Sequence, residues 1–306
     1  MASGLNVNVN PVLRREMVER MRGGRTFVIL TAYLAVLSLV LYGAYEVGRN
    51  TDDPTQTALV GRGLFGWLLF FMLLLVLFLV PGTAANAIAG ERERQTLVPL
   101  QVTLLSPQQI LLGKIYAAVA FLMLLVVATM PLLSVSYLVG GVTIGEVLGG
   151  VAAVLFVGLA LGCLSAAIST FTKRVQGAVV MSYGLVLLLT LGTLAVWGAY
   201  AMVDESRGVD EGNPPSYLVL ANPLATVTGV VGNGTDVGGN DSPFDWFEEL
   251  VLPDEFNEFT GEPTGDAANG LPASFMWSSI GLYAALAAGA VALGSRRLRT
   301  PAPTER

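Results

Sequence analysis

A run of four charged residues, Glu91 to Arg94, separates two long apolar stretches of the chain. Ionised side chains are too costly to place in the hydrocarbon core of a membrane, so this run must lie at a water interface. It opens a charged and then amphipathic segment, residues 90–114, which contains Pro107 and ends at Lys114. The chemistry that these side chains suit is the binding of a soluble partner.

Other residue types that carry out chemistry are scarce or badly placed for it. The chain has no histidine, which excludes imidazole metal sites and histidine-based acid–base catalysis. Its single cysteine, Cys163, lies in an apolar run, so no disulfide within the chain can form. We therefore predict neither a catalytic residue nor a metal site.

Ionisable side chains are also missing from the middle of every apolar run. Glu46, Lys114 and Glu146 stand at the ends of such runs, where headgroups or water can reach them. Carriers driven by a proton or ion gradient usually keep ionisable groups inside their helix bundle, because the charge must be bound and released there. The pattern therefore disfavours gradient-driven transport.

The chain lacks a nucleotide-binding loop of its own. Gly113-Lys114 resembles the end of a phosphate-binding loop, but Gln108 stands at the position of its first glycine and Ile115 replaces the Ser or Thr. We expect no cofactor on this chain, so any energy from ATP must be supplied by another polypeptide.

Composition indicates the elements that hold the charged segment. The 306 residues are 53% hydrophobic and only 13% charged, with a mean hydropathy of +0.64, whereas soluble domains have about 25% charged residues. We predict an all-α membrane protein with six transmembrane helices. The predicted spans are residues 26–45, 64–89, 115–139, 147–171, 175–203 and 273–294.

These spans divide the chain into four parts. Residues 1–25 form an N-terminal segment in which Asn10-Pro11 predicts a helix start, and an interfacial amphipathic helix follows; the alternative is a solvated basic tail. Residues 26–203 hold the first five spans. Residues 204–272 form an enlarged outer segment, and residues 273–306 the last span and a tail.

The distribution of charge predicts the orientation. Of the 17 Lys and Arg residues, 14 fall in the N-terminus, the charged segment, the Lys173-Arg174 turn and the C-terminus. Residues 204–272 instead contain 14 acidic residues and one basic residue, Arg207. The positive-inside rule then predicts a multi-pass protein of the cell membrane with both termini and the charged segment in the cytoplasm, and the acidic segment outside.

The outer segment contains one apolar stretch, residues 216–232, which Asn222-Pro223 interrupts. It is too interrupted to span a membrane and too apolar for a plain loop. A re-entrant or interfacial pair of short helices and the packed base of a small outer domain both fit it.

The charged segment resembles a known signature. Its motif residues are, in order, Glu91-Arg92-Glu93, Thr96-Leu97, Leu104-Leu105-Ser106-Pro107, Ile110 and Gly113-Lys114. This order is similar to the segment between the second and third spans of type-2 ABC transporter permeases, the exporter-type membrane subunits. The family commonly has Gly at the position of Gln95 and Glu near Val98, and Pro99 is unexpected, so we expect a different local geometry between residues 96 and 101.

The resemblance implies a coupling helix that seats in a cleft of a separate ATPase subunit, where ATP and Mg would bind. The implied coupling residues are Glu91, Arg92, Glu93, Thr96, Leu97, Pro107 and Lys114. It also implies a second permease copy or a sister chain in the lipid bilayer, and no nucleic acid.

The same resemblance implies an export path between the second and fifth spans. The residues expected near it are Phe70, Phe71, Phe78, Ser182, Thr190 and Trp197. Their apolar character suits a lipophilic or amphipathic substrate. The other functions that the sequence leaves open are a membrane anchor or sensor with an outer binding segment, and a channel, although no ring of charge supports a pore.

Overall fold

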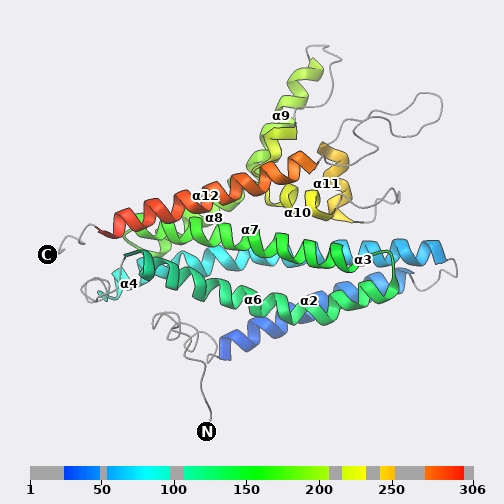
Figure 1. Cartoon of the computed structure of the whole chain (residues 1–306), viewed down its shortest axis with the longest axis horizontal. Coiled ribbons are helices and arrows are strands. Elements are labelled where there is room, and N and C mark those ends of the chain that lie inside the picture. Colours follow the sequence, from blue (N-terminus) through cyan, green and yellow to red (C-terminus); the bar gives the residue numbers. More distant parts are fainter. Residues whose placement is uncertain are drawn as a thin grey trace, which may run out of the picture.

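The computed structural model describes residues 24–48, 54–96, 107–206, 216–231, 242–251 and 273–299. These residues form helices and connecting turns and contain no strand (Figure 1). The expected N-terminal interfacial helix, Leu97 and most of the acidic segment lie outside them. The all-helical class predicted from composition is confirmed for the described part of the chain.

The helices follow one another with short connections. In order they are α2 (Gly24–Gly48), α3 (Pro54–Ala84), α4 (Asn86–Glu93), α6 (Pro107–Val139), α7 (Ile144–Phe171), α8 (Val175–Leu187), the π-helix η1 (Leu188–Gly192), α9 (Thr193–Ser206), the 3₁₀-helix η2 (Ser216–Val219), α10 (Pro223–Val231), α11 (Pro243–Val251) and α12 (Ala273–Arg299).

Five stretches within the described residues are long and apolar enough to cross a membrane. They are Thr57–Glu93, Leu111–Val139, Ile144–Phe171, Val175–Val203 and Ser274–Leu298. Helix α2 is 25 residues long, but its apolar part, Phe27–Gly43, is shorter. The chain is therefore a multi-pass membrane protein with about five long candidate spans.

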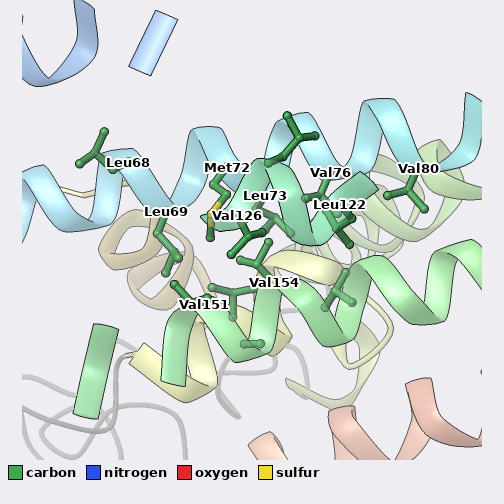
Figure 2. Packing of buried hydrophobic residues seen from close by; sticks show 14 of the residues in the cluster. Leu68, Leu69, Met72, Leu73, Val76, Val80, Leu122, Val126, Val151 and Val154 are labelled. Atoms are coloured by element: carbon green, nitrogen blue, oxygen red, sulfur yellow. The ribbon is translucent and has the colours of Figure 1, made fainter. Parts of the chain in front are cut away.

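Helix α7 lies at the centre of the bundle and packs against α3, α6, α8, α10 and α12. Figure 2 shows the main core, where Leu69, Met72 and Val76 of α3 face Leu122 of α6 and Val154 of α7. All five side chains are buried. In a membrane the alternative to burial is contact with lipid, which is as apolar as these side chains, so close van der Waals packing and not the hydrophobic effect holds them together.

Close packing in this core depends on Gly158 of α7. A Cβ atom at that position would lie 2.5 Å from Leu122 Cδ2 and 2.9 Å from Val76 Cγ1. Small residues allow membrane helices to approach closely, and Gly158 serves contacts inside one chain in this way. Gly281 and Gly289 of α12, in contrast, have open space where a side chain would stand.

Helix α3 begins earlier than the apolar pattern suggests, because the polar residues from Pro54 to Arg62 form its first turns. The turn between α6 and α7 packs against them. There Thr143 and Glu146 form a capping box at the start of α7, and Arg62 Nη1 lies 3.9 Å from Glu146 Oε1. This packing places charged groups at the end of the bundle opposite α4.

Residues 216–231 of the apolar stretch form two short helices, η2 and α10, packed against α9, α7 and α12. Buried hydrogen bonds hold them to α12: Ser279 Oγ donates to Leu220 O at 2.9 Å, and Tyr283 Oη to Ala221 O at 2.7 Å. Figure 1 shows α9 pointing away from the long axis of the bundle. The π-helix η1 precedes it, and π-bulges are a common cause of such bends.

Candidate functional site

The charged run lies on α4, a short helix separated from α3 by one residue, Ala85. Pro81 has no N–H and weakens the end of α3. The break itself falls four residues later, because α7 offers a hydrogen-bond acceptor there. Ser169 Oγ accepts the N–H groups of Ile88 at 3.1 Å and Ala89 at 2.8 Å, donors that lack partners in the first turn of a helix.

Glu91 joins α4 to the start of α6. Its Oε1 atom lies 2.9 Å from Nζ of Lys114, whose side chain is only 5% exposed, against 26% for Glu91. The other carboxylate oxygen of Glu91 accepts a hydrogen bond from Thr96 Oγ1. Lys114 lies two turns into α6, which begins at Pro107, a residue favoured in the first turn of a helix.

Arg92 joins α4 to the end of α7. Its guanidinium donates to the carbonyl oxygens of Thr170, at 3.1 Å, and Thr172. The last carbonyls of a helix have no partners within it and carry the negative end of the helix dipole, so a cation stabilises them. Arg92 therefore caps α7.

Glu93 joins α4 to the start of α8. Its Oε1 atom accepts the N–H of Val175, the first residue of α8, at 2.7 Å. Arg174, the N-cap residue of α8, makes no side-chain capping bond. A carboxylate is favoured at the positive end of a helix dipole, so Glu93 acts as the missing cap.

The end of α4 has the geometry of a Schellman motif. The Thr96 N–H donates to Glu91 O at 2.9 Å, and the Gln95 N–H to Arg92 O at 3.1 Å. Gln95 has a φ of 58°, a left-handed conformation that strongly favours glycine. Gln95 stands where the signature commonly has Gly. The left-handed backbone at this position would suit a glycine.

Glu91, Arg92 and Glu93 thus form one charged cluster that connects α4 with α6, α7 and α8. A family model described as ABC-2 family transporter protein matches residues 11–234, which include this cluster. The chain belongs to the ABC-2 family. It is the membrane component of an ABC-2 transporter, which is typically non-catalytic and implies an ATPase partner. A search of curated proteins gives no match for the chain.

The ABC-2 chain brings together most of the coupling residues that the sequence implies. Glu91, Arg92, Glu93, Thr96 and Lys114 lie in one network, and the backbone of α6 begins at Pro107. Leu97 lies outside the described residues. Their contact with an ATPase stays a prediction.

The six residues expected near the export path lie in three places. Phe70 and Phe71 pack edge to face with centroids 5.8 Å apart, and both also contact Trp67. Trp67 in turn meets Trp246 of α11 at 6.3 Å. These rings form an aromatic cluster near the end of the bundle opposite α4.

Phe78 lies two turns further along α3 than Phe71, 65% exposed, beside Tyr183 of α8. The Tyr183 hydroxyl donates to Phe78 O at 2.8 Å. A Cβ atom at Gly82 would lie 2.7 Å from that hydroxyl oxygen, so the glycine gives Tyr183 room to reach the backbone of α3. This contact links the second and fifth spans close to the α3–α4 break.

Ser182, Thr190 and Trp197 are less accessible. Ser182 is fully buried, and among the described residues neither its hydroxyl nor the Trp197 indole nitrogen has a hydrogen-bond partner. Trp197 packs in an apolar cluster with Phe247 of α11 and Phe275 of α12. The carbonyl of Thr190, in η1, accepts a bond from Asn222 Nδ2 at 3.1 Å.

Sequence reasoning did not identify Ser169, Tyr183 or Asn222 as residues that organise this site. Serine, tyrosine and asparagine are common in membrane helices and loops, and no local motif marks them. Their roles depend on backbone groups in distant segments, which the sequence does not reveal.

Proposed function

We propose that this ABC-2 chain is the permease subunit of an ATP-driven exporter and that residues 90–114 couple it to the ATPase subunit. Two permease chains, identical or sister, face each other above two ATPase subunits that bind ATP and Mg. Closure of the ATPase subunits moves the charged segments, and the second and fifth spans change from inward to outward access.

The charged cluster carries this proposal. Three consecutive side chains bind three different helices, with Glu91 on α6, Arg92 on α7 and Glu93 on α8. A force on α4 therefore acts on the end of each of these helices at once. Thr96 is bound to the same cluster through Glu91.

The orientation follows the positive-inside rule, with the α4 end and both termini in the cytoplasm. We propose that α2 is the sixth span, since its 25 residues cover about 37 Å at 1.5 Å per residue, more than a ~30 Å hydrocarbon core. The acidic segment, residues 204–272, is then extracellular.

We further propose that the export path runs along the face of α3 and α8 that carries Phe78 and Tyr183. Phe78 is 65% exposed, and neighbouring apolar residues of α8 such as Val180 are exposed as well. Of the six path residues named from the sequence, Phe78 lies exposed on this face, whereas Ser182 and Trp197 are buried. Such a surface suits a lipophilic or amphipathic substrate.

A matched pair of variants at Glu93 tests the coupling. Glu93→Gln keeps an oxygen that can accept the Val175 N–H, whereas Glu93→Ala removes it. The readout is maleimide labelling of Phe78→Cys in a Cys163→Ala background, with and without ATP, in the complex with its ATPase. ATP should change the labelling rate in the parent and the glutamine variant, and the change should be lost in the alanine variant.

Copurification of the ATPase subunit with each variant is the control for assembly. Unaltered ATP-dependent labelling in Glu93→Ala would show that the cluster does not transmit motion. Failure of any ATPase to bind the parent chain would instead contradict the exporter function itself.

A further inference from the structure

An exposed basic surface adjoins the charged cluster. Arg94 and Arg174 are both exposed. Arg94 follows Glu93 and Arg174 precedes Val175, the two residues joined by the hydrogen bond from the Val175 N–H to Glu93 Oε1. This 2.7 Å hydrogen bond keeps the end of α4 beside the start of α8, so the two arginines lie on neighbouring segments.

The end of α12 adds a third exposed arginine, Arg296, to the same end of the molecule (Figure 1). A Cβ atom at Gly294, two residues before it, would lie 3.5 Å from Thr170 Cγ2 of α7. The end of α12 therefore lies beside the end of α7, close to the turn that contains Arg174.

The acidic side chains nearby are already engaged. Glu91 pairs with Lys114, and Glu93 accepts the Val175 N–H. Glu93 keeps its negative charge in this hydrogen bond, but the exposed cations Arg94, Lys173, Arg174, Arg296 and Arg297 outnumber it, so the surface has a positive field that suits an anion.

The position of Arg174 limits what can reach it. Helix α7 ends at Phe171 and α8 begins at Val175, and both belong to membrane spans. A turn of three residues cannot extend far from the membrane surface, so Arg174 lies at headgroup depth. Phe171 and Leu293, which precede the basic residues on α7 and α12, are exposed apolar side chains suited to contact acyl chains.

We propose that Arg94, Arg174 and Arg296 bind the phosphate of an anionic phospholipid beside the charged cluster. Arginine forms paired hydrogen bonds with phosphate oxygens, and basic pockets at the ends of membrane helices bind anionic headgroups. A lipid there would support the α7–α8 turn that Arg92 and Glu93 hold. Lipid composition would then influence how firmly α4 is connected to α8.

The full chain in nanodiscs of phosphatidylcholine with increasing amounts of photoactivatable phosphatidylglycerol tests this surface. Mass spectrometry should locate crosslinks in the peptides that contain Phe171 and Leu293. In the variant Arg94→Gln, Arg174→Gln, Arg296→Gln, the lipid fraction that gives half-maximal crosslinking should rise by more than about fivefold, the effect expected for a single arginine.

The variant with lysine at the same three positions keeps the charge but loses the paired hydrogen bonds, so its crosslinking should fall between that of the parent and that of the glutamine variant. Circular dichroism checks that both variants fold. Equal crosslinking by the parent and the glutamine variant would overturn the proposal. Equal crosslinking of the parent by photoactivatable phosphatidylcholine would overturn it as well. Loss of the ATPase subunit from the glutamine variant with lipid crosslinking retained would assign the arginines to the protein interface and also overturn it.

Discussion

Gln95 ends α4 in a backbone conformation that a side chain disfavours. Its φ of 58° belongs to the left-handed region, where a residue other than glycine costs about 1–2 kcal/mol. The two Schellman hydrogen bonds hold it there. This energetic penalty falls within residues 90–114, the segment that we propose contacts the ATPase.

Replacing Gln95 by glycine should therefore stabilise the protein. We expect Gln95→Gly to raise the free energy of unfolding by about 1 kcal/mol, since relief of the left-handed strain outweighs the greater freedom of glycine in the unfolded chain. Thermal unfolding in detergent, followed by circular dichroism, measures it. Gln95→Ala is the control, because alanine keeps the Cβ atom and should give no comparable gain.

Lys114 pairs with Glu91 of the charged cluster and depends strongly on that ion pair. Its side chain is 5% exposed, so its ammonium group relies on Glu91. Lys114→Met should destabilise by about 2 kcal/mol, less than for a fully buried pair because Glu91 reaches water. The double variant Lys114→Met, Glu91→Gln should recover part of the loss, since no unpaired charge remains.

Equilibrium unfolding of the two single variants and the double variant gives the coupling energy of the pair. Strictly additive losses would contradict the ion pair as a stabilising contact.

At the scale of elements, the α3–α4 break depends on side chains from α7 and α8. Ser169 accepts the first N–H groups of α4, and Tyr183 reaches Phe78 O over Gly82. The break thus lies at the point where neighbouring helices supply hydrogen-bonding groups.

A double-variant cycle tests the contact of α3 with α8. Gly82→Ala should destabilise by about 1–2 kcal/mol, because its Cβ atom would lie 2.7 Å from the Tyr183 hydroxyl oxygen. In a Tyr183→Phe background the next nearest ring atom lies at 3.7 Å, an ordinary contact, so the alanine should be tolerated. The melting temperatures of the four proteins test this prediction. An equal loss of stability on Gly82→Ala in both backgrounds would refute the contact.

At the scale of the whole molecule, burial is uneven among the spans. Helix α7 is largely buried, whereas the span formed by α8, η1 and α9 leaves most of its surface open. Its exposed apolar residues include Val180, Leu187 and Leu191. The last span, Ser274–Leu298, is equally open, so low burial is shared by spans that face lipid or another chain. We propose that the fifth span is the one that faces a second permease chain.

Cysteine crosslinking in membranes tests that arrangement. In a Cys163→Ala background, Val180→Cys on α8 should form a dimer on oxidation. Val127→Cys on α6 should stay monomeric, because it is a valine of similar exposure, 63% against 70%, on a helix that we place away from the seam. Dimers from Val127→Cys alone would place the second chain on the other side of the bundle.

The sequence by itself determined the class and much of the site. Long apolar runs predict membrane helices because hydrocarbon excludes charge, and the ABC-2 membership follows from residues that the chain displays in order. The motif also named Glu91, Arg92, Glu93 and Lys114, which do lie in one network. Local signals were enough because charged side chains in an apolar chain are conspicuous.

Only the tertiary structure decided which group each of these residues binds. The partners of Arg92 and Glu93 are backbone atoms at the ends of α7 and α8, some 80 residues away in the sequence. Backbone groups carry no sequence signature, and their availability depends on where a helix ends. The same reason explains why Ser169 and Tyr183 became evident only once α7 and α8 were packed beside α3.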